Sequence, residues 1–529
     1  AAGTRNSAVG RNTLEANTTG GSNTAMGTNA LLLNTTASEN TAIGADALDA
    51  NTTGAENSAV GNDALGANTT GASNTAVGVK ALFTATTAAN NTAVGTQAMR
   101  LTTTGASNVA VGVQSLTANT TGAANVSIGK ETMLGNTTGA SNVAIGQDAM
   151  KANTTASNNT AVGQNSLSAN TTGTDNLAIG KDSLATNTTA DNNTAVGRSA
   201  LTANTSGNSN IAVGGYAMKT NTTGEDNSVV GKNALCTNTS GSNHVAMGKN
   251  ALYANTTGGN NTAVGTYALT ANTTGHSLVA MGCGALAANT TAAYNIAVGR
   301  GAMAATTTGH TNTAVGQTAL TVNTTGYNNI SIGASSLEAN TEGYQNVAVG
   351  NSSLTAVTTG DNNVGIGQSA GVNLTTGVKN VFLGFESGAQ GGMVNVTSED
   401  NRLVAGHSTI TNAYVKVDWT VTSDARDKTN FGSVPHGINF VKQLNPVSFQ
   451  FRTARGEDTT SGGVRYGFKA QEILALEKAN GGSNVIIDDE FEETLKLTGG
   501  QLVPVLVKAL QEQQTVIEDL TSRIETLEG

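Results

Sequence analysis

The sequence predicts a mainly β protein with a long solenoid shaft, a short β transition segment and a small α+β domain that ends in a helix. A glycine falls every 17 residues from Gly10 to Gly384, 23 times without insertion or deletion. All three prolines and the only tryptophan follow these repeats. A constant short period indicates a solenoid, in which each repeat buries its apolar face only against its neighbours. We expect the shaft at 1–390, the transition at 391–422 and the last domain at 423–529.

Each repeat contains one short strand, such as Thr75-Ala76-Val77, directly before its glycine. With the glycine as position 0, positions −3 and −1 share one face, and position −2, nearly always Ala, lies on the other. Because Ala has a small side chain and Gly has none, another backbone can approach this face closely. A strand that is apolar on both faces is expected to be covered on both, and a slender solenoid has only one inside. We therefore expect the second face to contact other copies of the chain, in a parallel homotrimer.

Two columns of asparagine run along the repeats. Position −4 is Asn in 21 of 23 repeats, the exceptions being His244 and Leu278, and position +7 begins an Asn-Thr-Thr-Gly turn at Asn51 and Asn68. Stacked amides can hydrogen-bond along such a column. An Ala-Leu pair at +3 and +4 supplies the other wall, as a strand or as one helical turn, because two apolar residues carry no readable period.

The composition excludes several classes of protein. With 3% aromatic and 12% charged residues and 65 glycines, the shaft has no conventional core of large side chains. A net charge of −10 without a basic stripe argues against nucleic acid, and no apolar run is long enough for membrane insertion. Cys236 and Cys283 lie at different repeat positions and form no disulfide framework. We expect His244, His276 and His310 to be solvated loop residues, and we assign no metal and no cofactor.

The last domain begins with a candidate catalytic pair. Ser423-Asp424-Ala425-Arg426-Asp427-Lys428 places a hydroxyl five residues before an amine. Burial favours the neutral amine, so that Lys428 can accept the proton of Ser423 while the serine attacks a carbonyl. The spacing alone also fits an ordinary polar turn.

Three motifs together resemble a known family. The Ser423–Lys428 motif is followed by Leu444-Asn445-Pro446-Val447-Ser448-Phe449, by Gly467-Phe468-Lys469-Ala470-Gln471-Glu472 and by a final helix. In this order they resemble the C-terminal intramolecular chaperone of phage tail fibres and tailspikes, over residues 423–529.

This resemblance implies a module that trimerises, templates folding of the fibre before it and then cuts itself off. It implies Ser423 as nucleophile, Lys428 as base and Thr422-Ser423 as the scissile bond. The enzyme activity would be at most that of a single-turnover, self-cleaving serine endopeptidase. Lys469 stands where the family more often has an apolar residue. The residues that support the motifs are Asp424, Arg426, Gly467, Phe468, Gln471 and Glu472.

A terminal helix is expected over 501–528 because its apolar residues keep heptad spacing. Branched residues on one seam with Leu on the other favour two strands, while Ala509 and Val516 widen the stripe, as either a third strand or packing on the rest of the domain would require. A core helix of a monomer is the alternative. The seam residues are Val503, Leu510, Ile517 and Ile524 with Leu506, Leu520 and Leu527, interrupted by Gln513.

The features together favour a structural phage tail fibre for host attachment, located in the virion tail and assembled in the host cytoplasm. Its expected partners are two further copies, other tail or baseplate proteins, and a host receptor that is a glycan or an outer-membrane component. The shaft also loosely resembles the β-roll heads of trimeric autotransporter adhesins, so a bacterial surface adhesin is one alternative. A tailspike depolymerase is another, although the repeats concentrate no paired carboxylates.

Overall fold

A computed structural model describes residues 3–391, 393–410, 413–414, 416, 423–452, 456, 458–481, 485–489 and 495–529. The chain divides into two compact units. The first comprises Ala1–Ser352 with Ala356–Asn362, and the second comprises Ser353–Thr355 with Asn363–Gly529. The fold is a long parallel β-solenoid of 17-residue repeats followed by a small α+β domain, as the sequence predicts.

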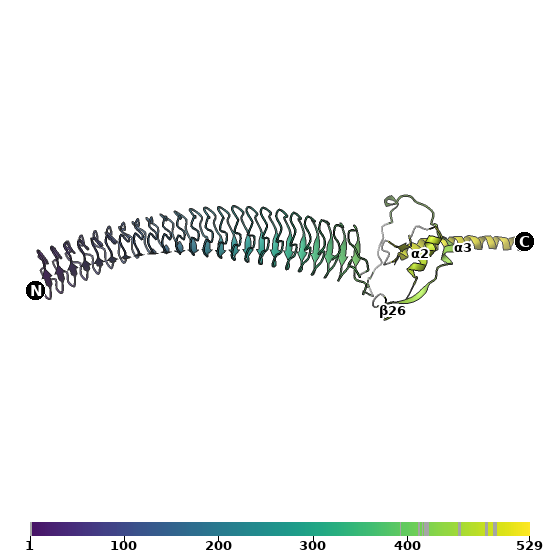
Figure 1. Cartoon of the computed structure of the whole chain (residues 1–529), viewed down its shortest axis with the longest axis horizontal. Helices are drawn as coiled ribbons and strands as arrows, with labels where there is room; N and C mark the ends of the chain where they lie inside the picture. Colours follow the sequence, from purple (N-terminus) through teal and green to yellow (C-terminus); the bar gives the residue numbers. More distant parts are fainter. Residues whose placement is uncertain are drawn as a thin grey trace. The chain divides into compact units, whose positions relative to one another are not determined.

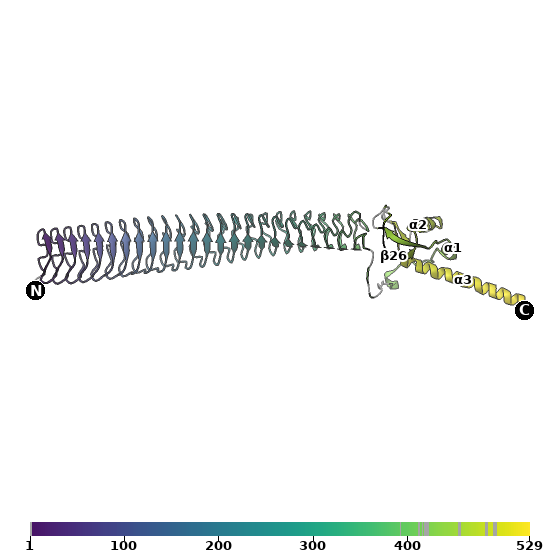
Figure 2. The same ribbon diagram turned by 90° about the horizontal axis from the view of Figure 1, so that it is seen from below.

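The first unit is a stack of repeats, one strand to each (Figures 1 and 2). Each strand pairs in parallel with the equivalent strand one repeat later, for example Thr75 with Thr92. The strands are β1 (Ser7–Val9), β2 (Thr24–Met26), β3 (Thr41–Ile43), β4 (Ser58–Val60), β5 (Thr75–Val77), β6 (Thr92–Val94), β7 (Val109–Val111), β8 (Val126–Ile128), β9 (Val143–Ile145), β10 (Thr160–Val162), β11 (Leu177–Ile179), β12 (Thr194–Val196), β13 (Ile211–Val213), β14 (Ser228–Val230), β15 (Val245–Met247), β16 (Thr262–Val264), β17 (Val279–Met281), β18 (Ile296–Val298), β19 (Thr313–Val315), β20 (Ile330–Ile332) and β21 (Val347–Val349).

The interior of the solenoid is thin and contains mainly alanine and leucine. In the repeat of β5, Ala76 points inward and is fully buried, whereas Val77 is 38% exposed on the outer face. The pair Ala81 and Leu82 is also fully buried, which confirms that it forms the second wall. The expectation that the Ala face contacts other copies is therefore wrong, because the alanine column packs inside its own chain. The face that its own chain leaves uncovered is the one that carries positions −3 and −1.

The Ala-Leu wall is neither a strand nor a helical turn. Leu82 has φ 52° and Lys80 has φ 55°, and the equivalent residues of nearly every repeat share these values. Each left-handed residue other than glycine costs roughly 1–2 kcal/mol. A repeat is therefore strained by itself and depends on the hydrogen bonds of the stack.

The repeat glycine makes a close contact with the next repeat of the same chain. The φ angles of these glycines lie in the left-handed region, and a Cβ on Gly61 would lie 2.5 Å from the carbonyl oxygen of Gly78. No other residue fits this position without moving the backbone, which explains why the period is never broken.

Both asparagine columns form the predicted ladders. The backbone N–H of Asn57 donates to Oδ1 of Asn40 at 2.9 Å, and its own Nδ2 donates to the carbonyl of Gly71 at 2.9 Å. In the second column, Nδ2 of Asn51 donates to Oδ1 of Asn34 and to the carbonyl of Gly54, both at 2.9 Å. Each amide thus links two repeats and also closes a turn.

Interruptions of the second column leave unsatisfied groups. Among the described residues of this column, Oδ1 of Asn68, Asn289 and Asn340 is buried without a hydrogen-bond partner. In each case the next repeat has no Asn at +7 but Ala85, Thr306 or Val357. The ladder therefore needs an amide in every repeat.

The prediction of solvated histidines is wrong for His244 and right for His276 and His310, which are exposed. His244 is 1% exposed, and its Nδ1 accepts a hydrogen bond from the backbone N–H of Asn261 at 3.3 Å. Burial lowers the pKa of His244 to about 4. The neutral imidazole takes the place of an Asn oxygen because it too offers an acceptor to the next backbone N–H.

The second unit begins with three further parallel strands, β22 (Val364–Ile366), β23 (Val381–Leu383) and β24 (Leu403–Ala405). From β23 to β24 the offset between paired residues is 22 instead of 17, as in the pairing of Val381 with Leu403. Phe382 occupies the inward position of β23, where most repeats have Ala, and is fully buried. The regular repeat thus ends at an aromatic residue. Of the β transition segment predicted at 391–422, residues 392, 411, 412, 415 and 417–422 lie outside the described residues.

The α+β domain follows in the same unit. It contains the 3-10 turn η1 (Ala425–Asp427), α1 (Ile438–Val441), the antiparallel hairpin β25 (Val447–Arg452) and β26 (Thr460–Gly467), and α2 (Ala470–Ala479). The short pair β27 (Ile487–Asp488) and β28 (Lys496–Leu497) precedes the long helix α3 (Gly499–Glu528). The core consists of Phe440, Ile473, Ile486, Ile487, Leu502 and Val505. None of the helices in the described part of the chain has the length and apolarity to cross a membrane.

Candidate active site

Ser423 and Lys428 lie in direct contact. Nζ of Lys428 donates to Oγ of Ser423 at 2.6 Å. The turn η1 between them brings these two residues together, and it closes where the backbone N–H of Lys428 donates to the carbonyl of Ala425 at 3.3 Å. Both side chains are exposed in the single chain. Thr422, on the other side of the predicted scissile bond, lies outside the described residues.

Asp424 and Arg426 hold the turn in shape. Oδ1 of Asp424 accepts the backbone N–H of Arg426 at 2.8 Å, which caps η1, and the carboxylate also pairs with the guanidinium. Hydrogen bonds from Arg426 lower the pKa of Asp424, and the carboxylate in turn raises the pKa of Arg426. An exposed pair contributes little to stability. Its effect is on geometry, because it fixes the loop between the hydroxyl and the amine.

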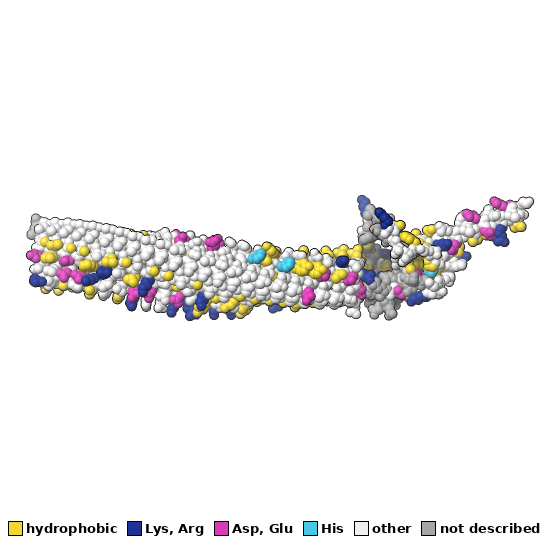
Figure 3. All heavy atoms as spheres, turned by 90° about the horizontal axis from the view of Figure 1, so that it is seen from above, with side chains coloured by type: hydrophobic (Ala, Val, Ile, Leu, Met, Phe, Trp, Pro, Cys, Tyr) yellow, Lys and Arg dark blue, Asp and Glu magenta, His cyan; other side chains and the backbone are white. Residues whose placement is uncertain are grey.

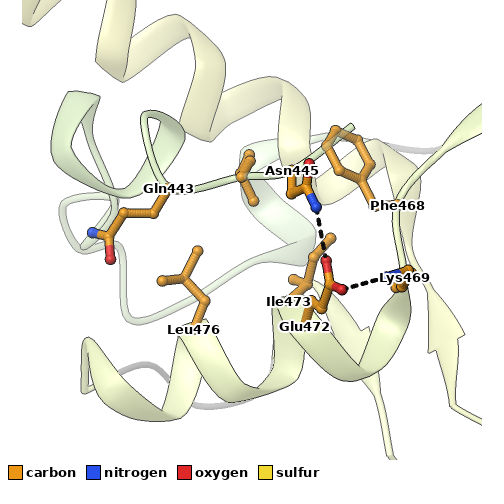
Figure 4. A pocket seen from close by; sticks show the side chains of 8 residues that line it. Gln443, Asn445, Phe468, Lys469, Glu472, Ile473 and Leu476 are labelled. Atoms are coloured by element: carbon orange, nitrogen blue, oxygen red, sulfur yellow. Dashed lines mark hydrogen bonds and ion pairs between the residues drawn. The ribbon is translucent and has the colours of Figure 1, made fainter. Parts of the chain in front are cut away.

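The other predicted supporting residues lie around the start of α2. Gly467 ends β26, and a Cβ there would lie 2.9 Å from Cε1 of Phe449, so glycine makes room for that ring. Phe468 and Glu472 line a small pocket (Figure 4), whereas Gln471 is exposed. The full lining is Gln443, Leu444, Asn445, Phe468, Lys469, Glu472, Ile473 and Leu476.

Lys469, the departure from the family pattern, is accommodated as a surface ion pair. Its Nζ donates to Oε1 of Glu472 at 2.7 Å, and Nδ2 of Asn445 donates to Oε2 of the same residue at 3.4 Å (Figure 4). The bond from Lys469 lowers the pKa of Glu472. Glu472 therefore joins α2 to the loop before β25, and Lys469 stays exposed outside the core.

Sequence reasoning missed Glu477, an acid that the domain buries completely. Its side chain is fully buried, and its two oxygens accept the backbone N–H groups of Val485, Ile486 and Ile487 at 3.0, 3.0 and 3.1 Å. This clamp fixes β27 to α2. A signal was available, because Glu477 lies four residues after Ile473 and so shares the core-facing side of the helix.

Helix α3 buries only its first part in its own domain. Leu502, Val505 and Ala509 are buried, and Glu512 accepts the backbone N–H of Ile438 at 2.7 Å, which ties α1 to α3. Beyond this point the helix extends from the domain (Figures 1 and 2). The predicted seam residues Val503, Leu506, Leu510, Ile517, Leu520, Ile524 and Leu527 are all exposed. The chain alone therefore does not cover its heptad stripe.

Comparisons with known proteins identify the last domain. Residues 423–481 match the family model described as chaperone of endosialidase. An autocleaving intramolecular chaperone domain of the kind typical of phage tail fibres and tailspikes is thus present at the C-terminus, after a β-solenoid shaft. No curated protein matches the chain. Within the described residues, no three His, Cys, Asp or Glu side chains are grouped so as to hold a metal ion.

Proposed function

We propose that the protein is the subunit of a trimeric phage tail fibre for host attachment, and that its last domain promotes trimerisation and folding and then releases itself by cutting Thr422-Ser423. The observation that carries the proposal is the 2.6 Å contact between Ser423 and Lys428. Ser423 is the first residue of the region matched by the chaperone family. The domain also directly follows the repetitive shaft whose folding it would direct.

The proposed reaction needs only groups that are adjacent in the chain. Lys428 in its neutral form accepts the proton of Ser423 Oγ, which attacks the carbonyl carbon of Thr422, in its own or in a neighbouring chain. The C–N bond breaks, the amine of Ser423 takes up a proton, and the acyl group of Thr422 is left as an ester on Oγ. Water then hydrolyses the ester to a free carboxylate at Thr422. Proximity replaces a substrate-binding site.

Assembly would cover this site, which the single chain leaves open to water. The side chains of Ser423 and Lys428 are exposed to water. A neutral amine is favoured by removal from water, so the reaction requires that the pair be covered. Cleavage after assembly would also keep the chaperone attached for as long as the fibre needs it.

The outer face of the strands supports the trimer. Position −1 is Val, Ile, Met or Leu in all 23 repeats, and neither −3 nor −1 is ever charged. The side chains at −1 are nevertheless well exposed in the single chain, for instance Val77 at 38% and Met247 at 45%. Soluble monomers rarely expose a contiguous apolar surface of this length. We assign this face, together with the seam of α3, to contacts between copies of the chain.

The test compares the purified chain with Ser423→Ala and Lys428→Ala, with Ser433→Ala as a control at another exposed serine of the domain. We expect a fragment ending at Thr422 in the parent chain and in the control, and only full-length mass in the two dyad variants. Full-length mass in all four proteins would refute the cleavage.

The trimer is tested by sedimentation of the uncut Ser423→Ala chain. Leu520→Asp on the exposed seam should reduce the trimer to smaller species, whereas Ser522→Asp, exposed but off the seam, should not. A monomeric Ser423→Ala chain would refute the proposed assembly.

A further inference from the structure

Aromatic side chains gather on one part of the shaft surface, and the 17-residue repeat does not require them there. Six of the eight tyrosines lie between residues 216 and 344. At position −6, every repeat before residue 270 has Gly, Ala, Ser, Thr, Asn, Asp or Glu. The following repeats place His276, His310, Tyr327 and Tyr344 there, with Tyr294 one position later. We call these five residues the aromatic column. Since small residues suffice elsewhere, the solenoid does not need these rings.

The rings of the aromatic column contact one another in two groups, one of two rings and one of three. The centroids of His310 and Tyr327 are 5.3 Å apart, and those of Tyr327 and Tyr344 are 4.9 Å apart with the rings nearly parallel. His276 and Tyr294 meet edge to face at 5.1 Å, and Tyr294 is 60% exposed. Figure 3 shows histidine side chains beside hydrophobic ones on the shaft surface. The aromatic column thus combines the apolar faces of its rings with the tyrosine hydroxyl groups and imidazole nitrogen atoms at their edges.

The polar groups around the column are acceptors and neutral donors. Asp361 occupies position −6 in the next repeat and accepts the backbone N–H of Tyr344 at 3.0 Å. Its charge raises the pKa of Tyr344, so that this hydroxyl remains a donor. Glu342, also exposed, replaces the second Thr of the Asn-Thr-Thr-Gly turn. From 271 to 362 the chain has three acidic residues and a single basic one, Arg300.

We infer that the aromatic column is a binding strip for neutral oligosaccharides. Amphipathic rings with a polar end suit ligands that have both apolar C–H faces and hydroxyl groups. Carboxylate, hydroxyl and imidazole groups supply the few polar contacts that fix orientation in such sites. The acidic surroundings disfavour sulfated, phosphorylated or sialylated chains, because like charges repel. Several copies on one fibre would raise a weak contact to useful avidity.

This inference rests on the proposed role in host attachment and names the class of receptor and its place on the shaft. The test uses the full-length chain, fluorescently labelled, on an array of neutral and acidic bacterial oligosaccharides. The variant Tyr327→Ser with Tyr344→Ala introduces residues that the same position has in other repeats, so the fold is preserved. The matched control is Tyr253→Ala with Tyr267→Ala, two tyrosines outside the column that are 39% and 41% exposed, and so are more accessible than the half-buried Tyr327 and Tyr344.

We expect the parent chain and the control to bind at least one neutral oligosaccharide, and the column variant to bind it at least about tenfold more weakly, the loss of roughly one ring contact of 1.4 kcal/mol. Unchanged melting of the variant would show that the shaft is intact. Binding only to acidic sugars, no binding to any neutral sugar, or equal binding by the variant would each overturn the inference. In all three cases cleavage and trimer formation would be unaffected, so the proposed function would stand or fall separately.

Discussion

Gly214 and Gly215 are neighbours in the sequence but have opposite surroundings, and this difference makes a quantitative prediction. Gly214 is a repeat glycine with φ +137°, and a Cβ there would lie 2.6 Å from the carbonyl oxygen of Gly231. Gly215 occupies position +1, and a Cβ there meets nothing within 4 Å. The two Gly→Ala substitutions add the same atoms to the same turn. Only the first should disturb the stack.

The expected magnitudes follow from backbone strain and contact. A side chain in a region of φ that only glycine populates costs about 1–3 kcal/mol, and a contact this short forces the next repeat to shift as well. We therefore expect Gly214→Ala to destabilise this part of the shaft by about 3 kcal/mol. Gly215→Ala should be neutral or stabilise by a few tenths to about 1 kcal/mol, because it restricts the unfolded chain.

The assay is amide hydrogen exchange in the repeats around β13 and β14, because a stack of repeats need not unfold in one step. A loss of about 3 kcal/mol corresponds to exchange roughly 100-fold faster. The amides that should report it include that of Ala234, whose N–H donates to the displaced carbonyl of Gly231 at 3.3 Å. Equal protection in the two variants would show that the close contact between glycine columns does not hold the repeats together.

Two further predictions concern the amide ladders. Thr306→Asn restores a missing step of the second column, because its Nδ2 can donate to the buried Oδ1 of Asn289 and its Oδ1 can accept from Nδ2 of Asn323, so we expect about 1 kcal/mol of stabilisation in urea unfolding; a loss of stability would contradict the ladder. His244, with a folded pKa of about 4, binds fewer protons than in the unfolded chain, so its stabilising contribution declines as pH falls from 6.5 to about 4. The decline, at most about 3 kcal/mol, should vanish in His244→Asn but persist in His276→Asn, and a parallel pH profile for all three chains would refute it.

The shaft was largely predictable because its determinants are local and recur. Period, strand position, amide ladders and the Ala-Leu wall all follow from residue types at fixed offsets, and the structure has each of them. The conformation of the wall was not predictable. Leu82 and its equivalents adopt φ near 50°, which a leucine by itself disfavours, so stacking overrides the local preference. The sequence also does not show which face of the strand stays exposed, since both faces are apolar.

The candidate site was predictable as a motif and not as a geometry. The spacing of five residues between Ser423 and Lys428 does not specify a contact, because an extended segment of that length would separate them widely. The contact depends on η1, which Asp424 caps. Glu477 was missed for a different reason. Its position four residues after Ile473 indicates a core-facing side chain, but its partners are backbone N–H groups of a segment eight to ten residues later, which leave no mark in the sequence.

The regularity of the shaft creates a problem of register that the end of the shaft can resolve. A slip by one repeat preserves almost every contact, because Gly meets Gly and Asn meets Asn again.

This equivalence of registers ends at β23 and β24. The inward position there is Phe382, and the offset to the next strand is 22 residues. A chain displaced by 17 residues would place this phenylalanine against an interior that elsewhere accommodates alanine, and overpacking of that kind costs about 1–3 kcal/mol or more. A slip is therefore penalised more strongly at β23 and β24 than in most of the repeats before them. The chaperone domain that begins at Ser423 follows this end in the sequence, so alignment can start there and pairing can then proceed toward the N-terminus through repeats that carry little register information of their own.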